Sequence, residues 1–342
     1  TLMRSSAASD VYKRQALNLN SGERNMKYVF IENPIAGRKN KQLLFRQVQS
    51  AFRMIDDEMI IEETCYKGHA KEIAAEYAAK YGKDCVVVSC GGDGTIHEIA
   101  NGLAHTQTPI MILPFGTGND FAKKIYGSKK LDAFNVVKSF GLHNGKIKYD
   151  VKPMDLIDYN GEKCVNVMSF GLDTMVETMG RKIAGKAKFL GHQAYNIAVL
   201  PALMHLHYQI NFEIDVADKD GDTFKWSLTP ADYTLFAICN ASYYGGGFCP
   251  APNSLIDDGL LDFCLVENVN LAQALPLVPK YSAGTANEET SKFIHNGYAV
   301  SGRIWSVNGE PLLGNCDGEN FDYPEVNFKV EKHALKICIP QM

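Results

Sequence analysis

The sequence predicts two domains of different fold class, an α/β domain in the first part of the chain and an all-β domain in the second. The length of 342 residues is enough for two domains of ordinary size. Up to about residue 147, apolar strand-like runs alternate with helix-like runs, which is typical of βαβ units and a mostly parallel sheet. Beyond that point, short alternating runs separated by turn residues replace them, and this pattern favours an all-β fold.

The first part of the chain is predicted to be a Rossmann-like α/β domain over residues 26–148. Its strands are short apolar runs, and its helices carry apolar residues near helical spacing. One alanine-rich helix is followed by Gly82, a common helix stop. In chain order, the expected elements are strand 27–31, helix 41–52, strand 60–66, helix 71–81, strand 85–90, helix 96–104, strand 110–113 and helix 121–126.

The second part is predicted to be a β-sandwich domain over residues 149–330, with one helical insert at 176–207. Turn residues such as Asn160-Gly161 separate its strands. The expected strands are 149–157, 164–170, 210–216, 233–240, 260–266 and 298–307. The closing segment 331–342 contains a last strand at 335–339, which could pair in either domain and so return the chain to the first one.

Composition and charge exclude several classes of protein. A formal net charge of −4 without arginine-rich blocks argues against a nucleic-acid partner. The nine cysteines are scattered and form no Cys-x-x-Cys pair, which indicates reduced thiols in the cytosol. No apolar run reaches the roughly 18 residues of a membrane-spanning helix. Residues 1–25 lack the apolar core of a secretory signal, and we expect them to be extraneous and disordered, with Met26 as the true start.

Two glycine-rich stretches carry the strongest functional signal. Gly91-Gly92-Asp93-Gly94-Thr95, with Glu98 three residues on, follows one buried strand, and 114–120 (Pro-Phe-Gly-Thr-Gly-Asn-Asp) follows the next. Such turns bring backbone N–H groups to the sheet edge where open α/β sheets bind ligands. Glycine lets the backbone approach a phosphate, and the following helix N-terminus adds positive potential. The stretches therefore predict a site for nucleotide phosphates.

The polar residues of these turns allow more than one role. Asp93 could cap a helix, or it could have a role linked to phosphate or metal. Asn119 or Asp120 could likewise cap the helix that follows them. Thr95 and Thr117 offer hydroxyl groups for phosphate oxygens.

Two acidic clusters lie late in the chain. Asp317 and Glu319 flank a glycine, so they could supply a general base and a metal partner, although Asp-Gly is also a common hairpin turn. The stretch 256–262 holds three aspartates that could bind a hard cation through oxygen ligands. Its alternative interpretation is a solvated turn.

The combined motifs resemble those of the bacterial diacylglycerol kinase and lipid kinase family, which includes the catalytic domains of diacylglycerol and sphingosine kinases. Gly-Gly-Asp-Gly-Thr-x-x-Glu at 91–98 is followed by Pro-x-Gly-Thr-Gly-Asn-Asp-Phe-Ala at 114–122. The first motif alone is shared with NAD kinases and phosphofructokinases, whereas the combination is more specific. Further landmarks are Asn33-Pro-x-x-Gly37, Phe170-Gly-x-Asp173, Gly245-Gly246-Gly247, Asp258-Gly-x-x-Asp262 and Asp317-Gly-Glu319.

The resemblance implies a set of roles for individual residues. ATP would lie between the domains and would be bound by Asn33, Pro34, Gly37, Thr64, Gly91, Gly92, Asp93, Gly94, Thr95, Glu98, Gly116, Thr117 and Asn119. Asp317 would be the general base with Glu319 beside it, while Asp93, Asp120 and Asp155 would organise the catalytic Mg²⁺. A separate structural Mg²⁺ would be held by Asp258 and by carbonyl groups near Leu255 and Leu260.

The sequence departs from the family pattern at one position in the first motif. His97 stands where many relatives have Asn, and it could change the polarity of the nucleotide pocket.

The function that the resemblance implies is an ATP- and Mg²⁺-dependent lipid kinase that converts diacylglycerol, or a similar lipid, to phosphatidic acid or its equivalent. We expect such an enzyme to be cytoplasmic and peripherally associated with the inner face of the membrane, with an apolar slot in the β domain for the acyl chains. A homodimer is expected by family analogy only. Two alternatives remain, an NAD kinase-like enzyme acting on a soluble substrate and a non-catalytic regulator that binds lipid or nucleotide.

Overall fold

The computed structural model describes residues 26–34, 41–53, 57–127, 131–141, 147–186, 197–198, 201–204, 207–218, 222–320 and 322–341. The prediction for residues 1–25 and the nucleotide-binding role of Gly37 fall outside these ranges. None of the helices in the described ranges is long and apolar enough to span a membrane.

The N-terminal domain is built on a parallel sheet in the order β4-β3-β1-β2. Both faces of the sheet are buried at β1, β3 and β4, which is why these strands are nearly continuous apolar runs, whereas the edge strand β2 is partly exposed. Side chains of β1 alternate between two cores: Val29 and Ile31 pack with α3 and α4, and Phe30 packs with α2. The elements are β1 (Lys27–Glu32), α2 (Lys41–Phe52), β2 (Glu58–Glu63), α3 (His69–Tyr81), η1 (Gly82–Asp84), β3 (Cys85–Gly91), α4 (Asp93–Leu103), β4 (Ile110–Pro114), α5 (Asp120–Tyr126) and α6 (Ala133–Ser139).

Several bounds in this domain differ from the sequence-based expectation: β2 ends at Glu63 and not at residue 66, and α3 begins at His69 and not at residue 71. Helix α4 begins at Asp93, three residues before the predicted start, because the N–H groups of Thr95 and Ile96 already bond to the carbonyl oxygen of Gly92. Helix α6 was not predicted, although Asp132 caps it through a hydrogen bond to the backbone of Asn135.

The C-terminal domain is β-rich, and its strands fold over one another into a sandwich. Strand β8 pairs with both β9 and β11, while β9 and β11 also pair with β10 between them. The layers enclose an aromatic and aliphatic core that includes Phe212, Phe236 and Phe263. The elements are β5 (Tyr149–Tyr159), β6 (Glu162–Cys164), β7 (Val167–Gly171), α7 (Leu172–Lys186), β8 (Tyr208–Ala217), β9 (Thr223–Cys239), β10 (Leu261–Glu267), α9 (Leu271–Ala274), α10 (Leu277–Ser282), β11 (Ile294–Trp305), β12 (Gly314–Cys316), β13 (Glu319–Asn320) and β14 (Glu325–Pro340).

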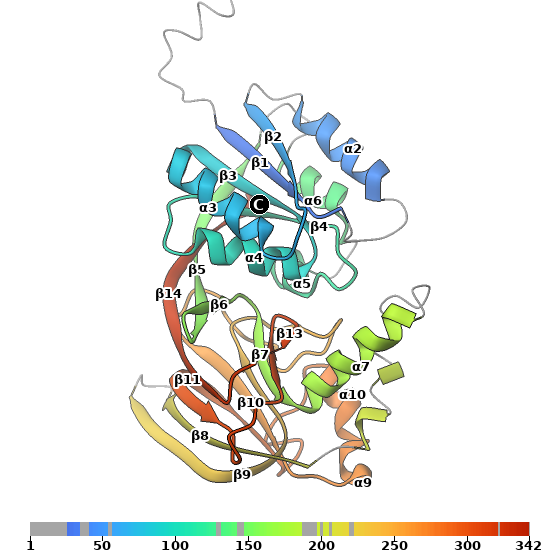
Figure 1. Cartoon of the computed structure of the whole chain (residues 1–342), viewed down its shortest axis with the longest axis vertical. Helices are drawn as coiled ribbons and strands as arrows, with labels where there is room; N and C mark the ends of the chain where they lie inside the picture. Colours follow the sequence, from blue (N-terminus) through green and yellow to red (C-terminus); the bar gives the residue numbers. More distant parts are fainter. Residues whose placement is uncertain are drawn as a thin grey trace, which may run out of the picture.

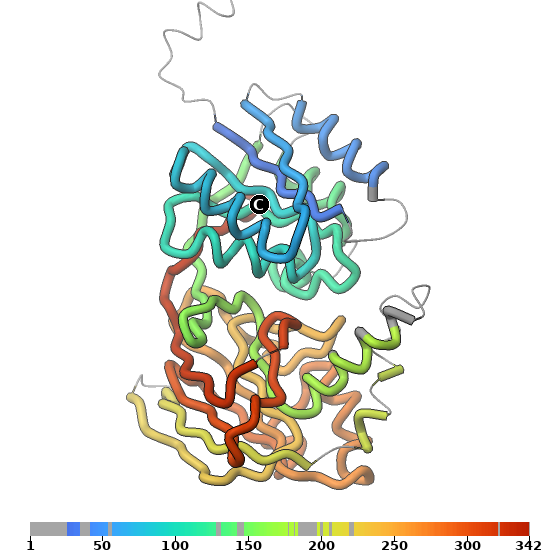
Figure 2. The backbone as a smooth tube through the Cα atoms, in the orientation of Figure 1, coloured from blue at the N-terminus to red at the C-terminus, as the bar shows by residue number. Residues whose placement is uncertain are grey.

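Strands β5 and β14 join the two domains as an antiparallel ribbon along one side of the molecule (Figure 1). The first residues of β14 pair with β11, whereas Ile337 near its end pairs in parallel with Ile110 of β4. The red end of the chain consequently lies among the blue and cyan segments of the N-terminal domain (Figure 2). The closing strand therefore pairs in both domains and makes one continuous sheet of them.

A buried carboxylate fixes the ribbon where it passes from one domain to the other. The register of β14 against β5 shifts between Glu331 and Leu335, and His333 within this bulge has a φ of 54°. The Asp155 carboxylate accepts N–H groups from His333 at 2.7 Å and from Gly259 at 2.6 Å. The resemblance implied that Asp155 organises the catalytic Mg²⁺. In the structure its buried carboxylate bonds to the backbone at the junction of the two domains.

Candidate active site

The two glycine-rich turns meet at the carboxyl ends of β3 and β4. The backbone N–H groups of Phe115 and Gly116 both donate to the carbonyl oxygen of Gly91 at 3.0 Å. Asn119, with a φ of 54°, folds its amide side chain back onto both the N–H and the carbonyl of Gly116 at 2.9 Å. The sequence predicted that both turns lie at the same edge of the sheet, which the structure confirms. Asn119 closes the second turn through its two hydrogen bonds to Gly116.

Asp93 caps a helix, as the sequence allowed, but the capped helix is α5, which follows the second glycine-rich turn. Its carboxylate accepts the N–H groups of Asp120 at 3.2 Å and of Phe121 at 3.1 Å, which are the first two residues of α5. Neither Asn119 nor Asp120 supplies the side-chain cap that the sequence allowed. Burial and the charge of Asp120 raise the pKa of Asp93 to about 6, against the lowering effect of the two N–H groups.

Asp120 reaches from α5 into the C-terminal domain. Its side chain accepts the N–H of Gly246 at 2.6 Å and pairs with Lys123 at 2.6 Å. A methyl group on Gly118 would lie 3.2 Å from the Asp93 carboxylate and 3.5 Å from that of Asp120, so both acids converge on this glycine. Paired carboxylates at the edge of a cavity are a donor set that fits a hard divalent cation.

Other predicted nucleotide-binding residues tie the N-terminal domain together. The Glu98 carboxylate accepts the N–H groups of Gly68 at 2.8 Å and Ala70 at 3.2 Å, which anchors α4 to the start of α3. The Asn33 amide reaches the hydroxyl of Thr95 at 3.3 Å. Thr64 lies at the end of β2, with its backbone N–H bonded to the carbonyl of Glu32. By contrast, Gly94 and Thr117 are exposed, and Pro34 is exposed as well.

Asp317 occupies the turn between β12 and β13 with a φ of 49°, a left-handed conformation unusual for residues other than glycine. Its buried carboxylate accepts backbone N–H groups from Val165 at 2.8 Å, Asn166 at 2.9 Å and Val167 at 3.3 Å. The Cys164 thiol adds a contact at 3.3 Å. The segment between β6 and β7 therefore wraps the carboxylate that the family resemblance makes the general base.

His97 completes the shell of Asp317 from the opposite domain. Its Nδ1 atom lies 2.8 Å from Oδ2 of Asp317. Burial alone would raise the pKa of Asp317, but the hydrogen bond and charge of His97 and the backbone N–H groups outweigh it, so this pKa lies below its ordinary value of 3.8. Burial likewise opposes the imidazolium, yet the contact with Asp317 keeps the pKa of His97 raised. Sequence reasoning assigned His97 to the nucleotide pocket and missed this contact.

Glu319 lies beyond the same turn and faces another part of the N-terminal domain. Its carboxylate pairs with Lys67 at 2.6 Å. Lys67 lies just before α3, so the turn of Asp317 and Glu319 contacts the N-terminal domain at two separate points.

The predicted structural Mg²⁺ site lies apart from these residues, near the junction of the domains. The Asp258 carboxylate accepts the N–H of Leu260 at 3.0 Å, and burial raises its pKa. Burial followed by the charge of Asp258 raises the pKa of nearby Asp262 to about 6. Leu255 is exposed. The binding of a cation by this loop stays a prediction.

Within the described ranges, His97, Cys316 and Asp317 form the one compact group of three metal-ligand side chains. Burial holds the pKa of the Cys316 thiol well above its ordinary value, which disfavours the thiolate that would bind a cation, and Nδ1 of His97 already contacts Oδ2 of Asp317. We therefore do not interpret this group as a metal centre.

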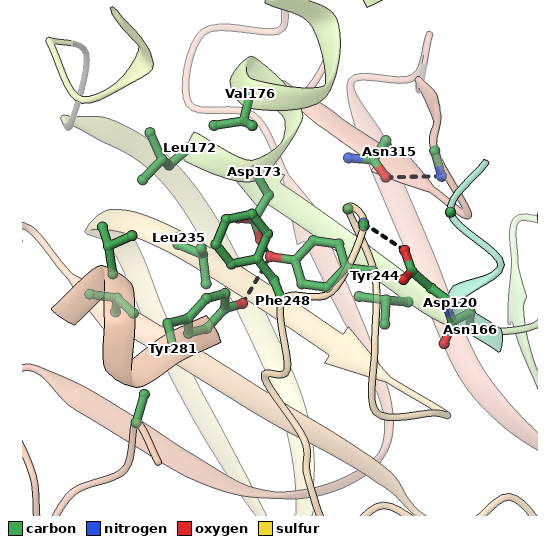
Figure 3. Close-up of a pocket in the computed structure, with 18 of the residues that line it drawn as sticks. Asp120, Asn166, Leu172, Asp173, Val176, Leu235, Tyr244, Phe248, Tyr281 and Asn315 are labelled. Atoms are coloured by element: carbon green, nitrogen blue, oxygen red, sulfur yellow. Dashed lines mark hydrogen bonds between the residues drawn. The ribbon is translucent and has the colours of Figure 1, made fainter. Parts of the chain in front are cut away.

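A cavity of about 280 Å³ connects the acidic edge of the sheet to the apolar interior of the C-terminal domain (Figure 3). Polar residues and glycines from both domains line one end: Asp93, Gly94, Thr117, Gly118, Asp120, Asn166, Asn315 and Asp317. The other end is apolar, with Leu172, Val176, Leu203, Leu235, Phe248, Val266, Leu277 and Val278 in its walls. The sequence predicted an apolar slot in this domain but not the residues that form it.

One carboxylate, Asp173, lies inside the apolar end of the cavity. Tyr244 donates a hydrogen bond to it, and the hydroxyls of Tyr244 and Tyr281 are 2.9 Å apart (Figure 3). Burial raises the pKa of Asp173 to about 7, although the two tyrosine hydroxyls lower it. Asp173 was predicted from the sequence only as a family landmark, although a charged residue two positions after the end of a buried strand was a signal for it.

The outer wall of the cavity is a thin layer formed by α9 and α10. Ala274 and Val278 face the cavity, whereas Leu271 and Leu275 are 41% and 50% exposed. We call 271–279 the apolar wall, because the segment Leu-Ala-Gln-Ala-Leu-Pro-Leu-Val-Pro contains no charged residue. A helical layer that is apolar on both sides is unusual at a surface that contacts only water.

Comparison with known proteins finds matches along almost all of the chain from residue 27 onward. Residues 27–150 match the diacylglycerol kinase catalytic domain, and residues 166–339 match the YegS C-terminal NAD kinase beta sandwich-like domain. A diacylglycerol kinase of Bacillus subtilis is 26% identical, over 84% of this chain and 88% of its own length. A probable lipid kinase YegS-like of Shewanella frigidimarina is 30% identical, over 74% of this chain and 76% of its own.

The fold is also similar to that of solved structures. The crystal structure of a diacylglycerol kinase from Bacillus anthracis superposes with a TM-score of 0.61 at 21% identity, covering 92% of this chain and 96% of the other. At this level of identity, the likeness establishes the two-domain fold.

Proposed function

Because the chain belongs to the lipid kinase family that joins a diacylglycerol kinase catalytic domain to a YegS-type C-terminal domain, we propose that it phosphorylates the hydroxyl group of diacylglycerol or a similar lipid, using ATP and Mg²⁺. The observation that carries the proposal is the cavity. One end holds three carboxylates beside the glycine-rich turns, and the other end is apolar. A lipid with a hydroxyl headgroup matches this division of polarity.

The geometry suits phosphoryl transfer more than covalent catalysis. The turns at 91–95 and 114–120 present backbone N–H groups and few side chains, as a phosphate requires. Asp93 and Asp120 would hold Mg²⁺, which neutralises charge on the transferring phosphoryl group. The lipid hydroxyl oxygen would attack the γ-phosphorus, the bond to the β-phosphate oxygen would break, and ADP would leave. Asp317 would accept the hydroxyl proton.

The apolar wall supports access of the lipid from a membrane surface. Its inner residues line the cavity, and its outer leucines are exposed next to the same cavity. A bilayer in contact with this layer would let acyl chains enter the cavity without crossing water. We therefore propose peripheral association with the cytoplasmic face of the membrane through 271–279. The homodimer stays an expectation from family analogy.

The alternatives from the sequence are less well supported. An NAD kinase-like enzyme would need a polar site for a soluble dinucleotide, whereas the walls of this cavity beyond Asn166 and Asn315 are mainly apolar. A non-catalytic regulator would not require Asp93, Asp120 and Asp317 to converge at one end of it.

The proposal is tested by incubating the full-length protein with radiolabelled ATP, Mg²⁺ and mixed micelles that contain one candidate lipid each, and then separating the products. Labelled phosphatidic acid from diacylglycerol is the expected result. Label on another lipid would keep the mechanism and change the substrate. Label on NAD alone, or on no acceptor, would overturn the proposal.

A further inference from the structure

The contact between His97 and Asp317 joins the two domains at the proposed general base. His97 lies on α4, whose first residue is Asp93, and Asp317 lies in the turn after β12. Their 2.8 Å contact spans 220 positions of sequence. The side chains are 12% and 2% exposed, so little water competes for the hydrogen bond.

The other hydrogen-bond donors to Asp317 come from its own domain. The N–H groups of Val165, Asn166 and Val167 and the Cys164 thiol belong to the segment between β6 and β7. Within the described ranges, His97 is the one donor to this carboxylate from the domain that carries the glycine-rich turns. It is therefore the contact that sets where the carboxylate lies relative to a nucleotide held at those turns.

The position of His97 is itself fixed by a neighbouring contact on the same helix. Asn101, one turn further along α4, donates to the carbonyl of Lys163 at 2.8 Å and accepts its N–H at 2.9 Å. This pair of bonds docks α4 on β6. The Asn101 amide also donates to the carbonyl of His97 at 2.9 Å.

We propose that His97 is a positioning residue that orients the Asp317 carboxylate toward the substrate hydroxyl and sets its proton affinity. This inference rests on the proposed function. The imidazole donates its Nδ1 hydrogen to the carboxylate whether or not the ring is charged. His97 therefore acts on Asp317 in two separable ways. Its hydrogen bond orients the Asp317 carboxylate, and its positive charge, when present, makes Asp317 a weaker base.

The charge of the ring depends on groups that are mostly acidic. The ionisable groups that face His97 are Asp317 and Glu319 at the β12–β13 turn, Glu162 on β6, and the Cys316 thiol within 4.8 Å. Lys67 neutralises part of the effect of Glu319. Because these acids favour the imidazolium, the pKa of His97 lies above its ordinary value of 6.5.

The sign of the pH effect follows from this arrangement. Below the pKa of His97, the imidazolium stabilises the ionised carboxylate and makes Asp317 a weaker base. Above it, the neutral ring still donates its hydrogen bond, but Asp317 binds a proton more readily. Turnover should consequently rise as pH increases through the pKa of His97.

The test compares two substitutions with the wild type. His97→Asn keeps an N–H donor attached to Cγ, as Nδ1 is, but cannot be charged, whereas His97→Leu removes the donor and the charge together. We expect His97→Asn to keep kcat within about threefold and to lose the pH-dependent rise, and His97→Leu to lose kcat by about tenfold or more with KM for ATP little changed. Dividing wild-type by His97→Asn rates at each pH cancels the ionisation of ATP and of the other carboxylates.

Two kinetic results would overturn the inference: a pH profile of His97→Asn that superposes on the wild type, or a folded His97→Leu protein with wild-type kcat. If His97→Leu does not fold, the profile of His97→Asn alone decides. The imidazole pKa, measured by NMR on histidine-labelled protein, should fall when Asp317 is replaced by Asn. An unchanged pKa would also overturn the inference. This titration needs no lipid, so it tests the contact between His97 and Asp317 separately from the proposed function: loss of lipid phosphorylation with a normal titration would overturn the proposed function and not the contact.

Discussion

Gly116 lies directly against Gly92, so that a methyl group added to Gly116 would stand 2.4 Å from the Cα atom of Gly92. The two glycine-rich turns are thus in backbone contact. We predict that Gly116→Ala separates them, lowers the free energy of unfolding by about 1–3 kcal/mol and strongly weakens ATP binding. Thermal unfolding and nucleotide titration measure the two effects.

Gly94 provides the matched control in the same pair of turns. A methyl group there meets no atom within 4 Å, and the residue lies in the first turn of α4. Gly94→Ala should therefore keep the stability of the wild type or exceed it slightly. If both substitutions destabilise the protein equally, the close approach of the turns is not the cause.

Asp317→Asn should abolish phosphoryl transfer and also destabilise the protein. The carboxylate accepts backbone N–H groups on both oxygens, and an amide would point its own NH₂ group at one of them. We expect a loss of about 1–3 kcal/mol in the free energy of unfolding near neutral pH. Because the pKa of Asp317 is lowered in the folded protein, this difference should shrink as pH falls below about 4. Wild-type turnover in a folded variant would contradict the role of Asp317 as base.

Mg²⁺ binding should strengthen as pH rises through about 6. The pKa of Asp93 is raised to about 6, so below that pH a proton competes with the cation for the carboxylate. Calorimetric titration at pH 5.5 and 7.5 should show tighter binding at the higher pH, with proton release at the lower one. Asp93→Asn should bind weakly at both. Equal affinity of the wild type at the two pH values would remove Asp93 from the metal site.

Filling the apolar end of the cavity should change the preference for acyl chains. Ala274 is buried and lines the cavity, whereas Ala272 on the same helix is exposed. We predict that Ala274→Phe lowers kcat/KM for long-chain diacylglycerol by about tenfold and spares short-chain substrates. Ala272→Phe is the control of equal added volume. The same chain-length profile in both variants would argue against an acyl site here.

A charge on the apolar wall should weaken membrane binding without changing the chemistry. Leu275 is 50% exposed beside the cavity, and Leu43 is 62% exposed. Leu43 belongs to α2, which lies in the other domain (Figure 1). Leu275→Glu should reduce co-sedimentation with lipid vesicles, whereas Leu43→Glu should not. Turnover of a soluble short-chain lipid should stay unchanged in both. If Leu275→Glu sediments with vesicles as the wild type does, the apolar wall is not the surface that binds the membrane.

The fold class and the family resemblance were predictable from the sequence, and both are confirmed. Both could be predicted because their sequence signals are local. Buried parallel strands are continuous apolar runs, and the glycine-rich turns follow the ends of these strands directly, so each pattern lies within a few residues. The meeting of the turns at 91–95 and 114–120 follows from the order of the strands.

The remaining features depend on contacts between segments far apart in the sequence. Asp93 caps α5 and not α4, because the folding of the second turn brings the N–H groups of Asp120 and Phe121 to it. His97 meets Asp317 across the two domains, a pairing that no local pattern encodes. The cavity likewise combines residues of α7, β9, α9 and α10. The sequence of each of these elements alone is typical of a segment that packs in a hydrophobic core.

The pairing of β14 with β4 has a consequence for the biosynthesis of the protein. During translation, the N-terminal domain emerges long before Ile337, so Ile110 and the rest of β4 lack their neighbour until the last part of the chain has left the ribosome. An unpaired strand edge is a template for aggregation. The nascent chain should therefore need a chaperone, or a pause, over most of its synthesis. Truncations near the C-terminus should make the distant N-terminal domain insoluble and not merely inactive.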